Sequence, residues 1–143
     1  MYENYTRQAL PDRHYRELLG SALCVFNSNN AFIIENILRN DHLGKYNWYN
    51  LIDKESGRLI QSVRETITNK CGESIEMLFS EIVNMRNRIM HSFQITKDGK
   101  QILATKEKAS DGGNQFVITE EYLLDFISRN ENLCSILHEF RGY

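Results

Sequence analysis

Arg86 and His91 are the two residues of this chain whose types and spacing best suit chemistry on a phosphate group. A guanidinium carries a permanent charge and a fork of N–H donors that matches phosphate oxygens. An imidazole can take up or release a proton near neutral pH. Together they could neutralise the charge that develops on a phosphoryl group and move the proton that the reaction requires, without a metal ion.

The segment that carries this pair, from Ser74 to His91, has the periodicity of an amphipathic helix. At about 100° per residue, its apolar side chains share one broad face. Arg86 falls inside that face, because its neighbours three and four residues away are Ile82, Val83, Ile89 and Met90. A separate polar stripe is formed by Ser80, Asn84, Asn87 and His91.

A guanidinium among aliphatic side chains is costly unless it meets an anion or strong hydrogen-bond acceptors. The anion of Arg86 could be a carboxylate of this chain, such as Glu17 or Glu35, a group on a partner subunit, or a phosphate. His91 also has a simple structural interpretation, because a histidine at the C-terminal end of a helix is favoured by the helix dipole.

The remaining pattern predicts a mainly α protein of the α+β class, a helical bundle with a small antiparallel β-sheet inserted before the C-terminal helix. Residues 12–92 are expected to form the helical core. Its first helix is capped by Asp12 and meets a polar interruption at residues 27–30, which predicts a kink or a functional polar patch. A second long helix ends near Gly72, and Ser74 is expected to cap the third.

After His91 the period changes from helix to strand. Residues 93–118 predict a β-meander that opens with a hairpin, because Asp98-Gly99 is a typical two-residue turn. Thr119 is expected to cap the C-terminal helix, residues 119–143. We expect these parts to form a single domain, residues 1–143.

The composition excludes several classes of protein. A formal net charge of −2 gives no overall attraction to nucleic acid, so any such contact must use a local basic patch. Three widely spaced cysteines, without a C-x-x-C pair, favour reduced thiols that fill the core of a cytoplasmic protein. The polar N-terminus lacks the apolar run of a signal peptide, and we expect no membrane-spanning segment. The other histidines have no metal-ligand spacing, and we expect no metal and no cofactor.

The Arg86-Asn87-Arg88-Ile89-Met90-His91 stretch, at the end of a long amphipathic helix in a small helical protein, resembles the R-x4-6-H signature of the HEPN family. The resemblance of fold covers residues 12–92. It implies a metal-independent RNA endonuclease of the toxin or phage-defence type, which acts as a homodimer and leaves a 2′,3′-cyclic phosphate. Arg86, His91 and Asn87 would then be the catalytic residues, with Arg88 and Asn84 as substrate-binding residues.

One position departs from a well-marked HEPN subgroup, in which a tyrosine two residues after the histidine is modified by an antitoxin. Here that position is Phe93, which has no hydroxyl, so an antitoxin or regulatory protein would act by binding. Four lysines could form a basic rim for RNA with Arg88, or simply protect exposed strand edges from aggregation: Lys97, Lys100, Lys106 and Lys108. The alternative to the nuclease is a non-catalytic HEPN-like module that binds a partner or a nucleotide.

Overall fold

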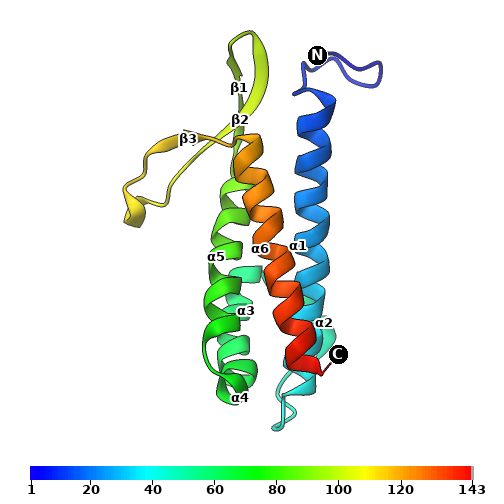
Figure 1. The fold of residues 1–143 in the computed structure, drawn as a ribbon, viewed down its shortest axis with the longest axis vertical. Helices are drawn as coiled ribbons and strands as arrows, with labels where there is room; N and C mark the ends of the chain where they lie inside the picture. Colours follow the sequence, from blue (N-terminus) through cyan, green and yellow to red (C-terminus); the bar gives the residue numbers. More distant parts are fainter. Residues whose placement is uncertain (143) are drawn as a thin grey trace.

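The computed structural model describes residues 1–142 and is mainly helical, with a small antiparallel sheet. Three long helices lie side by side along the molecule (Figure 1). They are α1 (Arg13–Arg39), α5 (Ser74–Met90) and α6 (Glu120–Arg141). α1 and α6 run in the same direction and α5 runs in the opposite direction (Figure 1). Three short helices cover the end of the bundle where α1 ends and α5 begins: α2 (Trp48–Asp53), α3 (Ser56–Val63) and α4 (Asn69–Cys71).

The caps of the first and last helices are as predicted. The Asp12 side chain accepts a hydrogen bond from the Tyr15 backbone N–H at 2.9 Å, and the Thr119 hydroxyl accepts one from Tyr122 at 3.1 Å. The prediction that Ser74 caps α5 is wrong. Ser74 is the first helical residue and Glu73 precedes it with φ −89° and ψ −5°, which is not the extended backbone that a side-chain cap requires.

The polar run at residues 27–30 does not kink α1, which is a single helix of 27 residues. Asn29 is buried, and its Nδ2 donates to the backbone oxygen and the Oδ1 of Asn130 on α6, at 2.8 and 3.0 Å. Asn30 Oδ1 accepts a hydrogen bond from the Ser56 hydroxyl at 3.0 Å. Hydrogen bonds to Asn130 on α6 and to Ser56 on α3 thus satisfy the side-chain amides of Asn29 and Asn30 inside the bundle, so the helix continues without interruption.

The second helical segment is less regular than predicted. Between α3 and α4 the chain forms a π-helical stretch, η1 (Arg64–Thr68), within which Thr66 Oγ1 donates to the Ser62 carbonyl at 2.7 Å. Gly72 ends the segment at φ +90°, as expected for a glycine after a helix.

The predicted meander is a three-stranded antiparallel sheet in the order β1-β2-β3. Its strands are β1 (Phe93–Lys97), β2 (Lys100–Lys106) and β3 (Gln115–Val117), and a short 3₁₀ turn, η2 (Ala109–Asp111), interrupts the connection from β2 to β3. Asp98 and Gly99 form the hairpin turn with φ of +51° and +75°. The Tyr15 hydroxyl donates to the Ile118 carbonyl at 2.7 Å, which ties the base of the sheet to α1.

The core is built from side chains of all three long helices and of α3, and its largest members include Phe26, Phe79 and Phe126. The expectation that the cysteines fill this core is wrong, because Cys24 and Cys71 are exposed and Cys134 is half-buried; all three are free thiols. Within residues 1–142, no helix combines the length and the apolar composition that crossing a membrane requires.

Candidate functional site

Arg86 lies near the C-terminal end of α5, on the face that packs into the bundle. The residues four before and three after it, Ile82 and Ile89, are buried, which follows from helical spacing. Its guanidinium carbon lies 5.4 Å from the ring centroid of Phe26 on α1. A cation over the face of an aromatic ring is attracted by the electron density of that face. The aromatic ring therefore replaces part of the hydration that the half-buried arginine has lost.

Among the residues that the structure describes, no carboxylate serves as the counter-ion of Arg86. Its Nη1 donates a hydrogen bond to Asn87 Oδ1 at 3.0 Å, and within residues 1–142 the guanidinium forms no ion pair. Glu35, one of the two acids considered from the sequence, binds Arg141 instead, and Glu17 is exposed. Arg86 is thus a half-buried cation that is positioned by a ring and an amide, and no acid of the described part of the chain neutralises it.

His91 follows the last residue of α5 and is the C-terminal cap of the helix. Its backbone N–H donates to the Asn87 carbonyl at 2.9 Å, and its side chain is exposed. Five residues on a helix correspond to a rotation of about 140°, so Arg86 and His91 point toward different sides of α5.

Asn84 and Arg88 lie on another side of α5, where they line a cavity of about 430 Å³ between α5, α6 and the segment that joins β2 to β3. Arg88 Nη1 donates to the Lys106 carbonyl at 2.6 Å, which holds the end of β2 against α5. Four of the five residues predicted to form one site therefore fall into two groups, and His91 belongs to neither. Arg86 and Asn87 form a hydrogen bond with each other, while Asn84 and Arg88 line the cavity.

The four lysines of the predicted basic rim are also separated. Lys97 and Lys100 face each other at the tip of the hairpin, Lys106 ends β2, and Lys108 lines the cavity with Arg88. These cations are spread over the hairpin and the segment that follows β2. The hairpin lysines fit the interpretation that they protect exposed strand edges.

Three aromatic residues of these two groups were not identified from the sequence. Phe26 supplies the ring beneath Arg86, and Phe116 and Tyr122 line the cavity with their ring centroids 5.6 Å apart. In the sequence each resembles any other apolar position of a helix or strand. Burial raises the pKa of Tyr122 to about 12, so its hydroxyl stays protonated and donates to the Met85 carbonyl at 3.4 Å.

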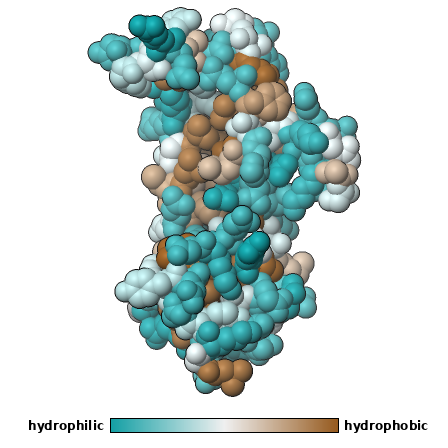
Figure 2. Space-filling model, turned by 180° about the vertical axis from the view of Figure 1, so that it is seen from behind, coloured by the Kyte–Doolittle hydropathy of each residue, from teal (hydrophilic) through white to brown (hydrophobic). Residues whose placement is uncertain are grey.

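Partly exposed apolar side chains lie on the faces of α1 and α5 that carry Phe26 and Arg86. Helical spacing places Leu19 and Leu23, both half-buried, on the Phe26 face of α1, and Met90, 51% exposed, one turn beyond Arg86 on α5. We call Leu19, Leu23 and Met90 the α1–α5 apolar surface. Figure 2 shows apolar side chains gathered in a strip along the upper half of the molecule, seen from behind.

No group of three or more histidine, cysteine or acidic side chains in the described part of the chain could hold a metal ion. Comparison of the chain with protein-family models, with curated proteins and with solved structures finds no match.

Proposed function

We propose that this protein is a metal-independent endoribonuclease of the HEPN type, which acts in the cytoplasm as a homodimer with Arg86 and His91 at a shared cleft. The observation that best supports the proposal is the environment of the Arg86 guanidinium. A guanidinium that is half-buried against Phe26, oriented by Asn87 and not neutralised by any acid within residues 1–142 is prepared to meet an anion from outside. The phosphate of an RNA chain is such an anion.

The reaction needs no metal and no cofactor. The ribose 2′-oxygen attacks the adjacent phosphorus, its proton passes to a base, and the bond from phosphorus to the 5′-oxygen breaks as that oxygen is protonated. The products are a 2′,3′-cyclic phosphate and a 5′-hydroxyl. His91 exchanges the protons, and Arg86 stabilises the negative charge on the phosphoryl oxygens at the transition state. Asn87 is the positioning residue of Arg86, through the 3.0 Å hydrogen bond.

Two features of the protomer support the proposed dimer. By helical spacing Arg86 and His91 are about 140° apart around α5, and a second copy of the helix would bring an arginine and a histidine of different protomers together. The α1–α5 apolar surface beside Arg86 supplies the area that such a copy would bury. With two histidines in one cleft, one accepts the proton of the 2′-hydroxyl and the other protonates the leaving oxygen.

The second candidate is a non-catalytic HEPN-like module in which the same surface binds a partner protein. The apolar residues around Arg86 favour this alternative, because an arginine surrounded by apolar side chains is also typical of protein interfaces. In either case a partner that restrains the protein would act by binding, since Phe93 offers no hydroxyl for modification.

The test is RNA cleavage in EDTA by the purified protein and by the variants Arg86→Ala and His91→Ala. We expect each variant to lose about 100-fold or more in rate, the usual cost of removing a transition-state stabiliser or proton-transfer group. Matched controls are Arg39→Ala and His42→Ala, exposed residues at or just beyond the far end of α1. Wild-type protein without cleavage, or variants as active as the controls, would reject the endoribonuclease. An inactive wild type that still dimerises would favour the interaction module.

A further inference from the structure

A helix covers the interval between α1 and α5 along only part of its length. In the half of the bundle away from the sheet, α3 packs against both long helices. The Ser56 hydroxyl at the start of α3 donates to Asn30 Oδ1 of α1 at 3.0 Å, and a β-carbon at Gly57 would lie 4.0 Å from Val83 Cγ1 of α5. From Ser56 the chain runs away from the sheet, through α3 and η1 to α4 (Figure 1). α3 therefore begins partway along the bundle and leaves the sheet side of the interval uncovered.

The α1–α5 apolar surface continues the two faces that α3 covers. Leu23 precedes Asn30 by seven residues and Met90 follows Val83 by seven, which is about two helical turns. Leu23 and Met90 thus lie on nearly the same faces of α1 and α5 as Asn30 and Val83, and Leu19 lies one turn beyond Leu23. Leu19 and Leu23 are half-buried and Met90 is 51% exposed. A helix in line with α3 would cover all three side chains.

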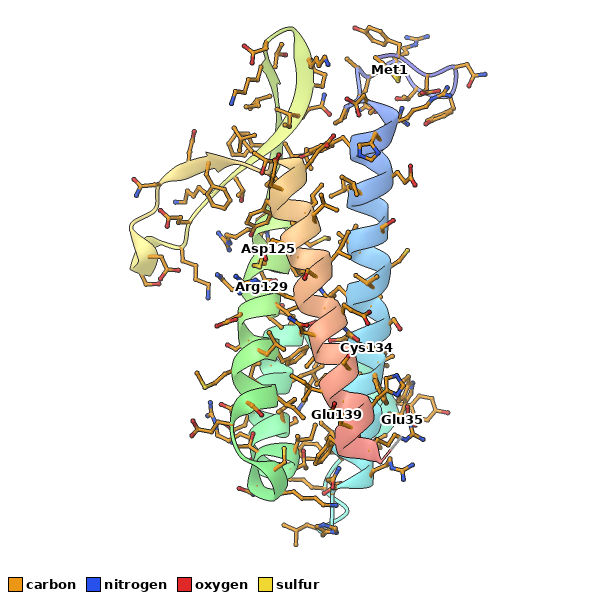
Figure 3. The ribbon with its side chains drawn as sticks, in the orientation of Figure 1. Met1, Glu35, Asp125, Arg129, Cys134 and Glu139 are labelled. Atoms are coloured by element: carbon orange, nitrogen blue, oxygen red, sulfur yellow. The ribbon has the colours of Figure 1, made fainter. Side chains whose placement is uncertain are left out.

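The front of the bundle and its sheet end are closed by other parts of the fold. At the front, α6 packs against both α1 and α5, and Figure 3 labels Arg129 and Cys134 along it. At the sheet end, Gln94 Nε2 of β1 donates to the Ala9 carbonyl, in the segment before α1, at 2.6 Å. The open side is the back, where Figure 2 shows the strip of apolar side chains.

The charge on this surface comes from Arg86. It lies three residues after Val83 and four before Met90, on the same side of α5, and its guanidinium extends over the Phe26 ring of α1. No acid within residues 1–142 forms an ion pair with it. An occupant that covers the apolar side chains also covers Arg86, and a buried cation requires a carboxylate beside it.

We propose that the α1–α5 apolar surface docks an amphipathic helix of a partner protein, whose apolar side chains pack on Leu19, Leu23 and Met90 and one of whose carboxylates pairs with Arg86. A helix fits because α3 fills the other half of the same interval in that form. Leu19 and Asn30 are about 16 Å apart along α1, the length of about three helical turns. Recognition of an amphipathic helix in this way uses anchors spaced three, four and seven residues apart.

Docking of the helix stands without RNA cleavage, whereas its effect on activity rests on the proposed function. The docked helix takes the guanidinium that the RNA phosphate needs and the surface that a second protomer would bury. It therefore inhibits the proposed endoribonuclease by binding alone.

The test is selection of a displayed library of helical peptides of about twelve residues, randomised along one face, on the full chain. We expect the enriched peptides to carry a carboxylate flanked by aliphatic residues at spacings of three or four. The tightest binder is then synthesised and titrated by fluorescence anisotropy. Replacing its carboxylate with the amide should weaken binding about tenfold, the value of one hydrogen bond to a charged group. The variant Arg86→Ala should bind the acid and amide forms equally.

Two variants of α5 locate the peptide on the surface. Met90→Glu places a carboxylate one turn from Arg86, where it competes with that of the peptide, and should weaken binding about tenfold or more. Met77→Glu, at a 59% exposed position on another face of α5, is the matched control and should bind the peptide as wild type does.

Three results would overturn the proposal: no enriched peptide whose binding depends on Met90, equal binding of the acid and amide forms by wild type, or a dimer that Met90→Glu separates but that no peptide displaces. The last result would assign the surface to a second copy of the chain. RNA cleavage in EDTA without peptide binding would reject the docking site and keep the enzyme. Peptide binding by a protein that does not cleave RNA would keep the docking site and reject the enzyme. Where both occur, cleavage at saturating peptide should fall at least tenfold, and undiminished cleavage would reject inhibition by the helix.

Discussion

The guanidinium of Arg86 lies over the ring of Phe26, with its central carbon 5.4 Å from the ring centroid, and Phe26 is only 1% exposed. The ring itself is fixed in the core, where it stacks on Phe126 of α6 with the centroids 6.2 Å apart. The charged end of Arg86 is thus held by the packing of two other helices. An acid in the same place would hold the arginine as well, but would cancel the charge that an RNA phosphate requires.

Replacing Phe26 with leucine should therefore impair RNA cleavage more than it impairs folding. The shape change in the core should cost about 1 kcal/mol of the free energy of unfolding. Loss of the ring leaves the guanidinium less well positioned, and we expect kcat/KM for RNA to fall about tenfold or more. Urea unfolding and initial cleavage rates measure the two effects.

The matched control for that variant is Phe79→Leu. Phe79 is fully buried on α5, and no cation–π contact joins it to Arg86 in the described residues. The Phe79→Leu variant should lose as much free energy of unfolding as Phe26→Leu does, but should cleave RNA at the wild-type rate. Equal loss of activity in both variants would mean that general loosening of the core, and not the ring beneath Arg86, is responsible.

Charge placed on the α1–α5 apolar surface should separate the proposed dimer. Met90 is 51% exposed, so Met90→Glu should leave the free energy of unfolding of the protomer within about 0.5 kcal/mol of wild type. A carboxylate buried at the interface would be costly, and we expect light scattering to show monomers and RNA cleavage to be lost. Met77→Glu adds the same charge to a 59% exposed position on another face of α5, and this variant should change neither the oligomeric state nor RNA cleavage. A wild type that is monomeric at all concentrations would contradict the shared cleft.

The buried amide pair between α1 and α6 should contribute to stability. Asn29→Ala removes the donor that lies 3.0 Å from Asn130 Oδ1 and leaves that oxygen buried without it. We expect a loss of about 1–3 kcal/mol in the free energy of unfolding, measured with urea. Asn132→Ala, at an exposed position of the same helix α6, should cost less than about 0.5 kcal/mol. Similar values for the two variants would show that the buried pair contributes nothing specific.

Acid should remove the contribution of Glu65, which lies in the π-helical stretch η1. Its carboxylate accepts hydrogen bonds from the Tyr46 hydroxyl, from Gln61 Nε2 at 3.1 Å and from Lys45 Nζ at 3.0 Å, and these lower its pKa from 4.5 to about 2. A carboxyl group with a lowered pKa in the folded state stabilises the fold above pH 4.5, and this contribution disappears as the pH falls toward 2.

The variant Glu65→Gln isolates that contribution from those of the other acids. At neutral pH it should unfold at a lower urea concentration than wild type, and the difference between the two proteins should shrink steadily between pH 4.5 and 2. A difference that is the same at pH 7 and pH 2.5 would show that the charge of Glu65 does not stabilise the fold.

Much of the local structure follows from short stretches of sequence, because it depends on neighbours along the chain. Asp12 and Thr119 cap their helices, and Asp98-Gly99 forms the hairpin turn, each through contacts within three residues. The predictions fail where local structure depends on a contact with a residue far away in the sequence. Residues 27–30 were expected to form a kink or a functional polar patch in the first helix, and the kink is absent because Asn29 is accommodated by Asn130, 101 residues away.

The candidate site shows the same difference between features set by neighbours in the sequence and features set by distant contacts. Helical spacing alone placed Arg86 on the apolar face of its helix and His91 at the end of that helix, since both depend only on the 3.6-residue period. Which group meets the guanidinium depended on how α1 and α5 both pack against α6, and the answer was the ring of Phe26 and not a carboxylate. The cavity at Asn84 and Arg88 likewise exists because α6 and the β2–β3 segment approach the opposite side of α5. Periodicity reports the direction in which a side chain points, whereas its partner is chosen by the packing of elements that are far apart in the chain.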